Sequence, residues 1–195
     1  MNVKKAVMRS GIIIAIILAS VIFGVIFQKV SDNVERSKYP LDHREFVEKY
    51  SSEYGVPQNV IFAVIKTESG FDSSLLSDDG KIGLMQVSPE TLEAYKEELH
   101  DSYDTGMLYD PETNIKYGTY RLSKIYLKVG TWRAAFAAMA TDEDTVLSWL
   151  ADPEYSEITE MHKPKLLTIP DKYASEFTEK LEKTSEKYKE LYFNK

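Results

Sequence analysis

Residues 68–91 read ESGFDSSLLSDDGKIGLMQVSPET, and the rest of the chain can be interpreted outward from this stretch. An apolar run precedes it, with residues at helical spacing that mark one face: Val60, Ile61, Val64 and Ile65. Glu68 continues that face near the helix C-terminus. Burial and the helix dipole both disfavour a charged carboxylate there. The pattern predicts a carboxyl that can act as a general acid, and the alternative is a helix-end Glu that turns to water.

A structured loop follows the acid. Gly70, Gly80 and Gly83 punctuate residues 69–87, where turns are favoured. Ser88 is suited to cap the next helix, and Pro89 to stand in its first turn. A helix-end acid, a loop and a new helix therefore lie within 24 residues.

This segment resembles the lytic transglycosylases of the Slt type, within the lysozyme-like superfamily. Their signature is E-S-x-F, a loop ending in S-x-x-G-x-x-G-L-M-Q, then P-x-T. It is matched here by Glu68, Ser69, Phe71, Ser77, Gly80, Gly83, Leu84, Met85, Gln86, Pro89 and Thr91. The resemblance implies an all-α, lysozyme-like domain with a substrate groove.

Further matches extend the resemblance to about residues 45–180. The family pattern D-P-x-x-N-I-x-x-G-x-x-x-L is matched by Asp110, Pro111, Asn114, Ile115, Gly118 and Leu122. Gly118 inside a helix suggests close helix packing. The family's A-Y-N-A-G motif is not kept, because Met139 and Ala140 stand where its Tyr and Asn are expected. Phe177 stands in place of a late family Tyr.

The resemblance also implies a chemistry and a set of site residues. Glu68 would be the single acid and base that cleaves the β-1,4 bond between N-acetylmuramic acid and N-acetylglucosamine in peptidoglycan, leaving a 1,6-anhydro sugar without any cofactor. Ser77 and Gln86 would orient the acid and the sugar. The other implied residues are Met85 and Met139 lining the groove, with Ser69, Thr91, Asn114 and Phe177 in support.

The N-terminal segment predicts a membrane anchor. Lys4, Lys5 and Arg9 precede residues 10–28, which carry no charge. At about 1.5 Å per residue they span about 28 Å, close to the hydrocarbon thickness of a bilayer. No clear A-x-A cleavage site follows. We expect a single-pass anchor in the cytoplasmic membrane of a bacterium, with residues 1–9 in the cytoplasm and the body outside. A cleaved signal peptide is the alternative.

Smaller features complete the predicted organisation. Residues 29–41 are polar and are expected to form a linker to the domain at 42–195. Within that domain, Asp42 and Thr141 are expected to cap helices, and Leu127 to be buried. Residues 152–170 contain three prolines and are expected to be an irregular connection.

Composition excludes several classes of function. The chain has no cysteine, and its three histidines are far apart, which argues against thiolate chemistry and a zinc site. Residues 37–195 carry nineteen Lys and Arg against twenty-nine Asp and Glu, an acidic balance that argues against nucleic acid as a partner. Two other functions stay open: a weakly active or inactive wall-binding scaffold, because the Tyr-Asn pair is missing, and a hydrolytic muramidase of the goose-lysozyme type.

Overall fold

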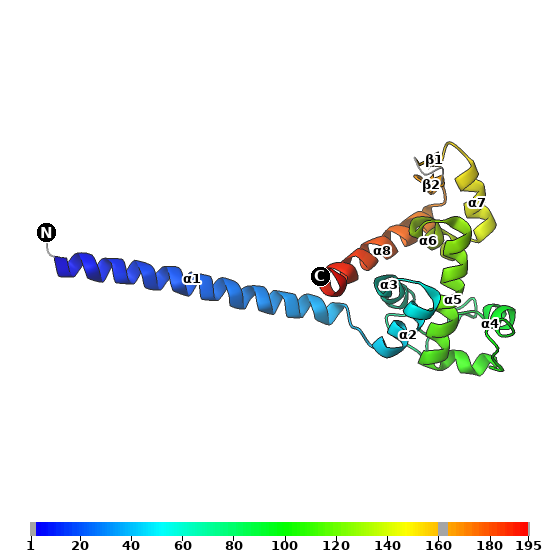
Figure 1. Ribbon diagram of the computed structural model, residues 1–195, viewed down its shortest axis with the longest axis horizontal. Coiled ribbons are helices and arrows are strands. Elements are labelled where there is room, and N and C mark those ends of the chain that lie inside the picture. The colour runs from blue at the N-terminus through cyan, green and yellow to red at the C-terminus, as the bar shows by residue number, and fades with distance from the viewer. Residues whose placement is uncertain (1–2, 160–163, 195) are drawn as a thin grey trace. The chain divides into compact units, whose positions relative to one another are not determined.

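A computed structural model describes residues 3–159 and 164–194, and for residues 3–16 and Asp32 only the backbone. The chain divides into two compact units, Met1–Pro40 and Leu41–Lys195. Both units are shown in Figure 1.

The first unit is one long helix, α1 (Val3–Lys38). It continues through residues 29–38, so most of the expected linker is helical. The last turn carries Arg36 and Lys38, whose positive charges are favourable at a helix C-terminus, and Lys38 pairs with Glu35 at 3.0 Å. Pro40 disfavours helical backbone at the residue before it. Within the described part of the chain, α1 alone is long and apolar enough to span a membrane, over Ile17–Lys38. The side chains of the predicted basic tail lie outside the described residues.

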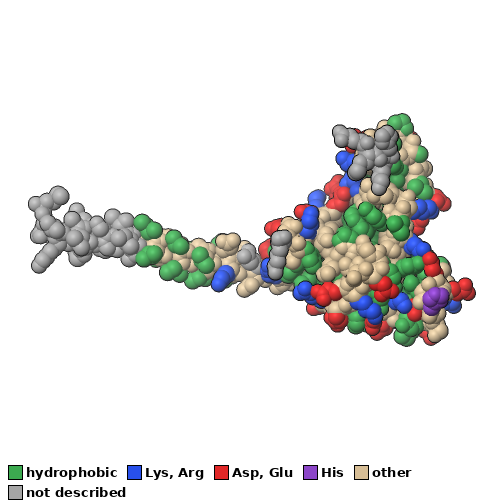
Figure 2. Space-filling view, in the orientation of Figure 1, with side chains coloured by type: hydrophobic (Ala, Val, Ile, Leu, Met, Phe, Trp, Pro, Cys, Tyr) green, Lys and Arg blue, Asp and Glu red, His purple; other side chains and the backbone are tan. Residues whose placement is uncertain are grey.

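Apolar side chains cover the described part of α1, as Figure 2 shows in green. Phe23 is 70% exposed and Val25 52% exposed. In water such a surface is unfavourable, because roughly 25 cal/mol is lost for every Å² of apolar area left exposed. The composition of this helix therefore fits an apolar environment better than water.

The second unit is mostly helical, as predicted. Its helices are α2 (Arg44–Tyr54), α3 (Gln58–Glu68), α4 (Pro89–Tyr95), η1 (Thr105–Tyr109), α5 (Pro111–Val129), α6 (Trp132–Ala140), α7 (Glu143–Ala151), α8 (Lys172–Tyr188) and η2 (Lys189–Phe193). Strands β1 (Ser156–Ile158) and β2 (Pro164–Leu166) form an antiparallel pair in which Ser156 faces Leu166.

Helix α3 is the centre of the core. Its residues 61–65 are all fully buried, so the helix is covered all round and not on one face only. Helix α8 packs along it, and Phe62 stacks on Tyr188 at 5.4 Å between ring centroids. Asn59 donates a 2.8 Å hydrogen bond to the Ser185 hydroxyl. These contacts hold the helix that carries Glu68 in a fixed position.

Capping geometry defines several helix ends and confirms the cap predicted at Ser88. Ser88 and Asp110 each accept a hydrogen bond from a backbone N–H three residues later, at the starts of α4 and α5. Gly55 and Gly130 end α2 and α5 in left-handed conformations, with φ of 70° and 82°. These starts and stops depend on residues only a few positions apart.

Other local predictions are wrong. The N-cap residue of α2 is His43, with φ of 61°, and not Asp42. Asp142 caps α7 by accepting from the Thr145 N–H, so Thr141 instead ends α6. Leu127 is 77% exposed, because it lies opposite the face of α5 that buries Leu122 and Ile125.

The expected irregular connection at 152–170 also contains regular structure, the short β1–β2 hairpin. The Ser156 hydroxyl donates to the Leu150 carbonyl at 2.8 Å and ties the hairpin to the end of α7. The prolines do not prevent the pairing, because Pro164 stands at the first position of β2.

Candidate active site

Glu68 is the last residue of α3, as predicted, and its side chain is half-buried. Burial raises the pKa of its carboxyl above the usual value near 4.5. Three cations, Lys81, Arg121 and Lys180, act in the opposite direction, while the negative charge of Asp79 adds to the rise. Among residues 3–159 and 164–194, none makes a hydrogen bond or an ion pair with this carboxyl. The group is therefore poised to hold a proton and is free to pass it to a ligand.

Ser69 joins the end of α3 to the loop. Its hydroxyl donates to the Leu84 carbonyl at 2.8 Å and accepts from the Phe71 N–H at 3.2 Å. Phe71 has a φ of 74°, a left-handed backbone conformation that residues other than glycine rarely adopt. The structure thus places Ser69 where it holds a strained turn directly after the acid.

Asn114 holds the far end of the loop. Its Oδ1 accepts from the Met85 N–H at 2.7 Å, and its Nδ2 donates to the carbonyls of Ile82 at 2.7 Å and Leu108 at 2.8 Å. It is 1% exposed. Gly83 lies against it: a Cβ there would come within 2.5 Å of the Asn114 Nδ2. These side-chain to backbone bonds add to the backbone bonds within the loop, such as the pair between Ile82 and Val87.

Met85, a loop residue, packs on Gly118, so the close approach expected at this glycine is made by the loop and not by another helix. A Cβ at Gly118 would come within 2.6 Å of the Met85 sulfur. Met85 and Met139 line one narrow cavity of about 10 Å³, together with Val64 and Arg121. Val64 lies one turn before Glu68 on the same face of α3. The two methionines are therefore brought together beside the acid-bearing face.

Ser77 and Gln86 are used differently from the expectation. The Ser77 hydroxyl donates to Asp79 Oδ1 at 2.5 Å and accepts from the Lys81 N–H at 2.9 Å. Gln86 is 5% exposed and donates from Nε2 to the Gly83 carbonyl at 2.8 Å. In this state both polar groups stabilise the loop, and within the described residues neither is bonded to Glu68.

The two remaining predicted site residues lie on neighbouring helices. The Thr91 N–H donates to the Ser88 hydroxyl at 3.2 Å and so closes the cap of α4. Phe177 lies on α8, half-buried, and stacks on Tyr173 at 6.1 Å. Neither contact involves the acid, so the supporting role of both residues stays a prediction.

The charged residues around Glu68 were missed by the motif comparison. Arg121 is the clearest, because it lines the methionine cavity and acts on Glu68 electrostatically. A signal was available in the sequence. Arg121 follows Gly118 by three residues and directly precedes Leu122, so it borders the buried face of α5.

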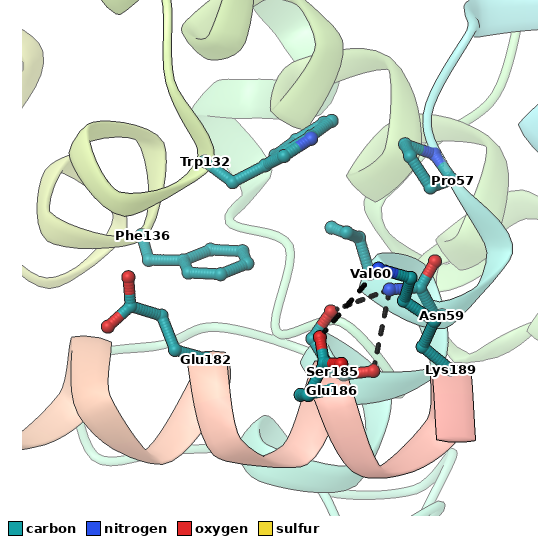
Figure 3. A pocket seen from close by; sticks show the side chains of 9 residues that line it. All are labelled: Pro57, Asn59, Val60, Trp132, Phe136, Glu182, Ser185, Glu186 and Lys189. Carbon is teal, nitrogen blue, oxygen red and sulfur yellow. Dashed lines mark hydrogen bonds and ion pairs between the residues drawn. The ribbon is translucent and has the colours of Figure 1, made fainter. Parts of the chain in front are cut away.

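A more spacious cavity lies elsewhere. It measures about 580 Å³ and is lined by residues of the α3 start, α6 and α8, including Trp132, Phe136 and Glu182 (Figure 3). Asn59 and Ser185, joined by a hydrogen bond, form part of its wall. No predicted site residue lines it. Glu68 itself does not line this cavity either.

Nothing in the described part of the chain gathers three His, Asp or Glu side chains at metal-binding distance. The reactive group to be explained is thus the lone carboxyl of Glu68.

Comparisons with known proteins agree with this geometry. The chain is 32% identical over 127 residues to the soluble lytic murein transglycosylase of Escherichia coli K12, covering 64% of this chain and 20% of that protein. It is 31% identical over 106 residues to the membrane-bound lytic murein transglycosylase C of Serratia proteamaculans, covering 53% of this chain and 29% of that protein. It thus spans well under a third of either relative.

The fold comparison gives the same result. The crystal structure of the 70 kDa soluble lytic transglycosylase of Escherichia coli matches with a TM-score of 0.70 at 25% identity, covering 80% of this chain and 25% of that chain. The family described as the transglycosylase SLT domain matches residues 45–162, more than half of the sequence. The chain belongs to this transglycosylase SLT domain family, which has the lysozyme-like fold.

Proposed function

We propose that the chain is a lytic transglycosylase that cleaves peptidoglycan glycan strands with Glu68 as its single acid and base. One observation carries the proposal: a half-buried carboxyl with a raised pKa stands at the end of a rigid helix and has no partner within the described residues. The relatives named lytic murein transglycosylases support the substrate and the reaction class.

The proposed reaction has two proton transfers. Protonated Glu68 donates to the glycosidic oxygen as the bond from C1 of N-acetylmuramic acid breaks, and N-acetylglucosamine leaves with a free 4-hydroxyl. The Glu68 carboxylate then takes the proton of the muramic C6 hydroxyl while that oxygen bonds to C1. The enzyme is restored, and the product carries a 1,6-anhydro ring. An attached nucleophile benefits from a high effective molarity, which favours C6 over water.

A hydrolytic route needs a second carboxylate or a positioned water. Of the carboxylates near Glu68 in sequence, Asp72 and Asp79 have other partners, and Asp78 and Glu90 are exposed to water. Asp72 accepts from the Ser74 N–H at 2.8 Å, and Asp79 pairs with Lys81 at 2.9 Å. Glu90 is exposed in the first turn of α4, where its charge suits the helix dipole. These partners support the single-acid route.

The product decides between lysis by ring closure and hydrolysis. Full-length protein in detergent would be incubated with purified sacculi in water labelled with heavy oxygen, and the fragments would be analysed by mass. We expect fragments lighter by one water than hydrolysis products, without label. Label at C1 in most fragments would support the muramidase alternative, and absence of soluble fragments the scaffold alternative.

We also propose that α1 anchors the protein in the cytoplasmic membrane, single-pass, with residues 1–9 in the cytoplasm and the domain outside. The exposed apolar side chains of Ile17–Lys38 support it. The protein should stay with membranes after alkaline washing, and protease added to spheroplasts should remove the domain. A soluble mature form that begins after residue 28 would instead indicate a cleaved signal peptide.

A further inference from the structure

The charges around Glu68 differ in sign from the rest of the domain. Residues 37–195 carry twenty-nine acidic and nineteen basic side chains, an excess of ten acidic ones. Yet among the charges that act most strongly on Glu68, Lys81, Arg121 and Lys180 are positive and only Asp79 is negative. The cations near Glu68 favour binding of an anionic ligand there, whereas the acidic surface of the rest of the domain disfavours it.

The three cations are not equally available. Lys81 is paired with Asp79 at 2.9 Å. Lys180 is exposed on α8 and makes no ion pair within the described residues, but its ammonium is well hydrated. Arg121 is only partly exposed, and over residues 3–159 and 164–194 its guanidinium likewise has no hydrogen bond or ion pair. A partly buried charge without a partner is unfavourable until a ligand supplies one.

Arg121 also lies at the junction of two hollows. One is the narrow cavity that it shares with Met85 and Met139. The other is an open cavity of about 260 Å³, shared with Ala138 and Thr141 at the end of α6. The side chain therefore borders the acid-bearing face on one side and a space large enough for a substituent of a sugar on the other.

Acidic residues on the rim of the open cavity do not neutralise Arg121. Asp142 accepts from the Thr145 N–H at 2.8 Å and hydroxyl at 2.7 Å to cap α7. Glu143 pairs with Lys128 at 2.8 Å, and the third acid, Asp144, is close to the same lysine at 3.4 Å. Each acid thus has a hydrogen-bond or ion-pair partner other than Arg121, although the three acids and Lys128 line the same cavity as Arg121.

We infer that Arg121 is a specificity-determining residue that binds a carboxylate on the muramic acid unit next to the cleaved bond. A guanidinium matches a carboxylate with two parallel hydrogen bonds, which a lysine cannot reproduce. The carboxylate has two possible sources, the lactyl group of a muramic acid freed of its peptide, or an acidic group of an attached stem peptide. This inference rests on the proposed function, since it concerns the same groove.

The test compares three substrates: peptide-free strands, the same strands with lactyl carboxylates converted to methylamides, and strands that carry peptides. Full-length wild type, Arg121→Gln and Arg121→Lys would be assayed in detergent for kcat and KM. Lys124→Gln is the matched control. It removes a cation from the same helix, one that pairs with Glu98 and lines neither cavity.

We expect Arg121→Gln to lower kcat/KM about ten- to hundredfold, mostly through KM, on the strands whose carboxylate it binds. The loss on methylamide strands should be under about twofold, and Arg121→Lys should recover only part of it. A loss confined to peptide-free strands identifies the lactyl group, and one confined to peptide-bearing strands identifies the peptide. Equal losses on all three substrates, or no loss, would overturn the inference.

A binding measurement separates this inference from the proposed function. Affinity for the same three strands would be measured for Glu68→Gln and for Glu68→Gln combined with Arg121→Gln. A preference for carboxylate strands that disappears with Arg121 supports the inference even if wild type cleaves nothing, in which case only the proposed function fails. Cleavage without any such preference leaves the function intact and rejects the inference.

Discussion

Two polar centres of the domain contrast with each other: the Asn114 end of the loop and the Glu68 end of α3. Asn114 is 1% exposed and uses both polar atoms in three short hydrogen bonds to the backbone. Glu68 is also largely withdrawn from water, yet its carboxyl has no such partner in the described residues. A satisfied buried group stabilises the fold, whereas an unsatisfied one keeps its capacity to react.

The largest expected effect concerns the unsatisfied centre. Glu68→Gln keeps the shape of the side chain but removes the transferable proton. Because acid–base catalysis contributes typically 10²–10⁴-fold, we expect lytic activity on sacculi to fall at least a hundredfold, with an unchanged circular dichroism spectrum. Retention of a tenth of the rate in a turbidity assay would contradict the assignment.

The next effect concerns the satisfied centre. Asn114→Ala leaves the Met85 N–H and the carbonyls of Ile82 and Leu108 without their partner. We expect a loss of about 3 kcal/mol in the free energy of unfolding, measured by urea denaturation, since unsatisfied buried groups cost about 1–3 kcal/mol each and water can compensate in part.

Asn59→Ala is the matched control for Asn114→Ala. It removes a partly buried hydrogen bond to Ser185 at the other end of α3, so about 1 kcal/mol should be lost. Equal losses for the two variants would show that the loop does not depend on Asn114 in the way described here.

Met139→Tyr should have a smaller effect. A hydroxyl near Glu68 can bond the acid or the substrate, which Met139 cannot do, so we expect a rise in lytic rate of a few-fold. The narrow cavity beside Met85 leaves little room, and a ring forced inward would cost about 1–3 kcal/mol in stability. An unchanged or lower rate with an intact fold would indicate a differently arranged groove.

The smallest effect is a dependence of stability on pH. The folded state binds a proton on Glu68 more readily than the unfolded state, because burial raises the pKa above its usual value near 4.5. Glu68 therefore makes the protein lose stability as pH rises from that value through the raised pKa. Glu68→Gln removes this loss, so its stability advantage over wild type should grow from pH 4 to pH 7 in urea titrations. If the stability advantage of Glu68→Gln shrinks over this pH range, the nearby cations lower the pKa of Glu68 more than burial raises it.

The sequence by itself determined much of the framework. Ser88, Asp110, Gly55 and Gly130 begin and end helices through contacts within four residues, so they can be read locally. The position of Glu68 at a helix end was predicted from local periodicity, and the helical class and the family from the resemblance of spaced motifs. The roles assigned to the site residues stay predictions, since no contact with a substrate tests them.

Only the tertiary structure decided how the polar side chains are used. Asn114 bonds Ile82 and Met85, 32 and 29 residues away, and no local pattern encodes that distance. Gln86 points its amide at the loop, and Arg121 reaches the acid-bearing face only because α5 packs beside it. Local hydrogen bonds decide where helices begin and end, whereas the partners of a buried polar group depend on how distant segments pack.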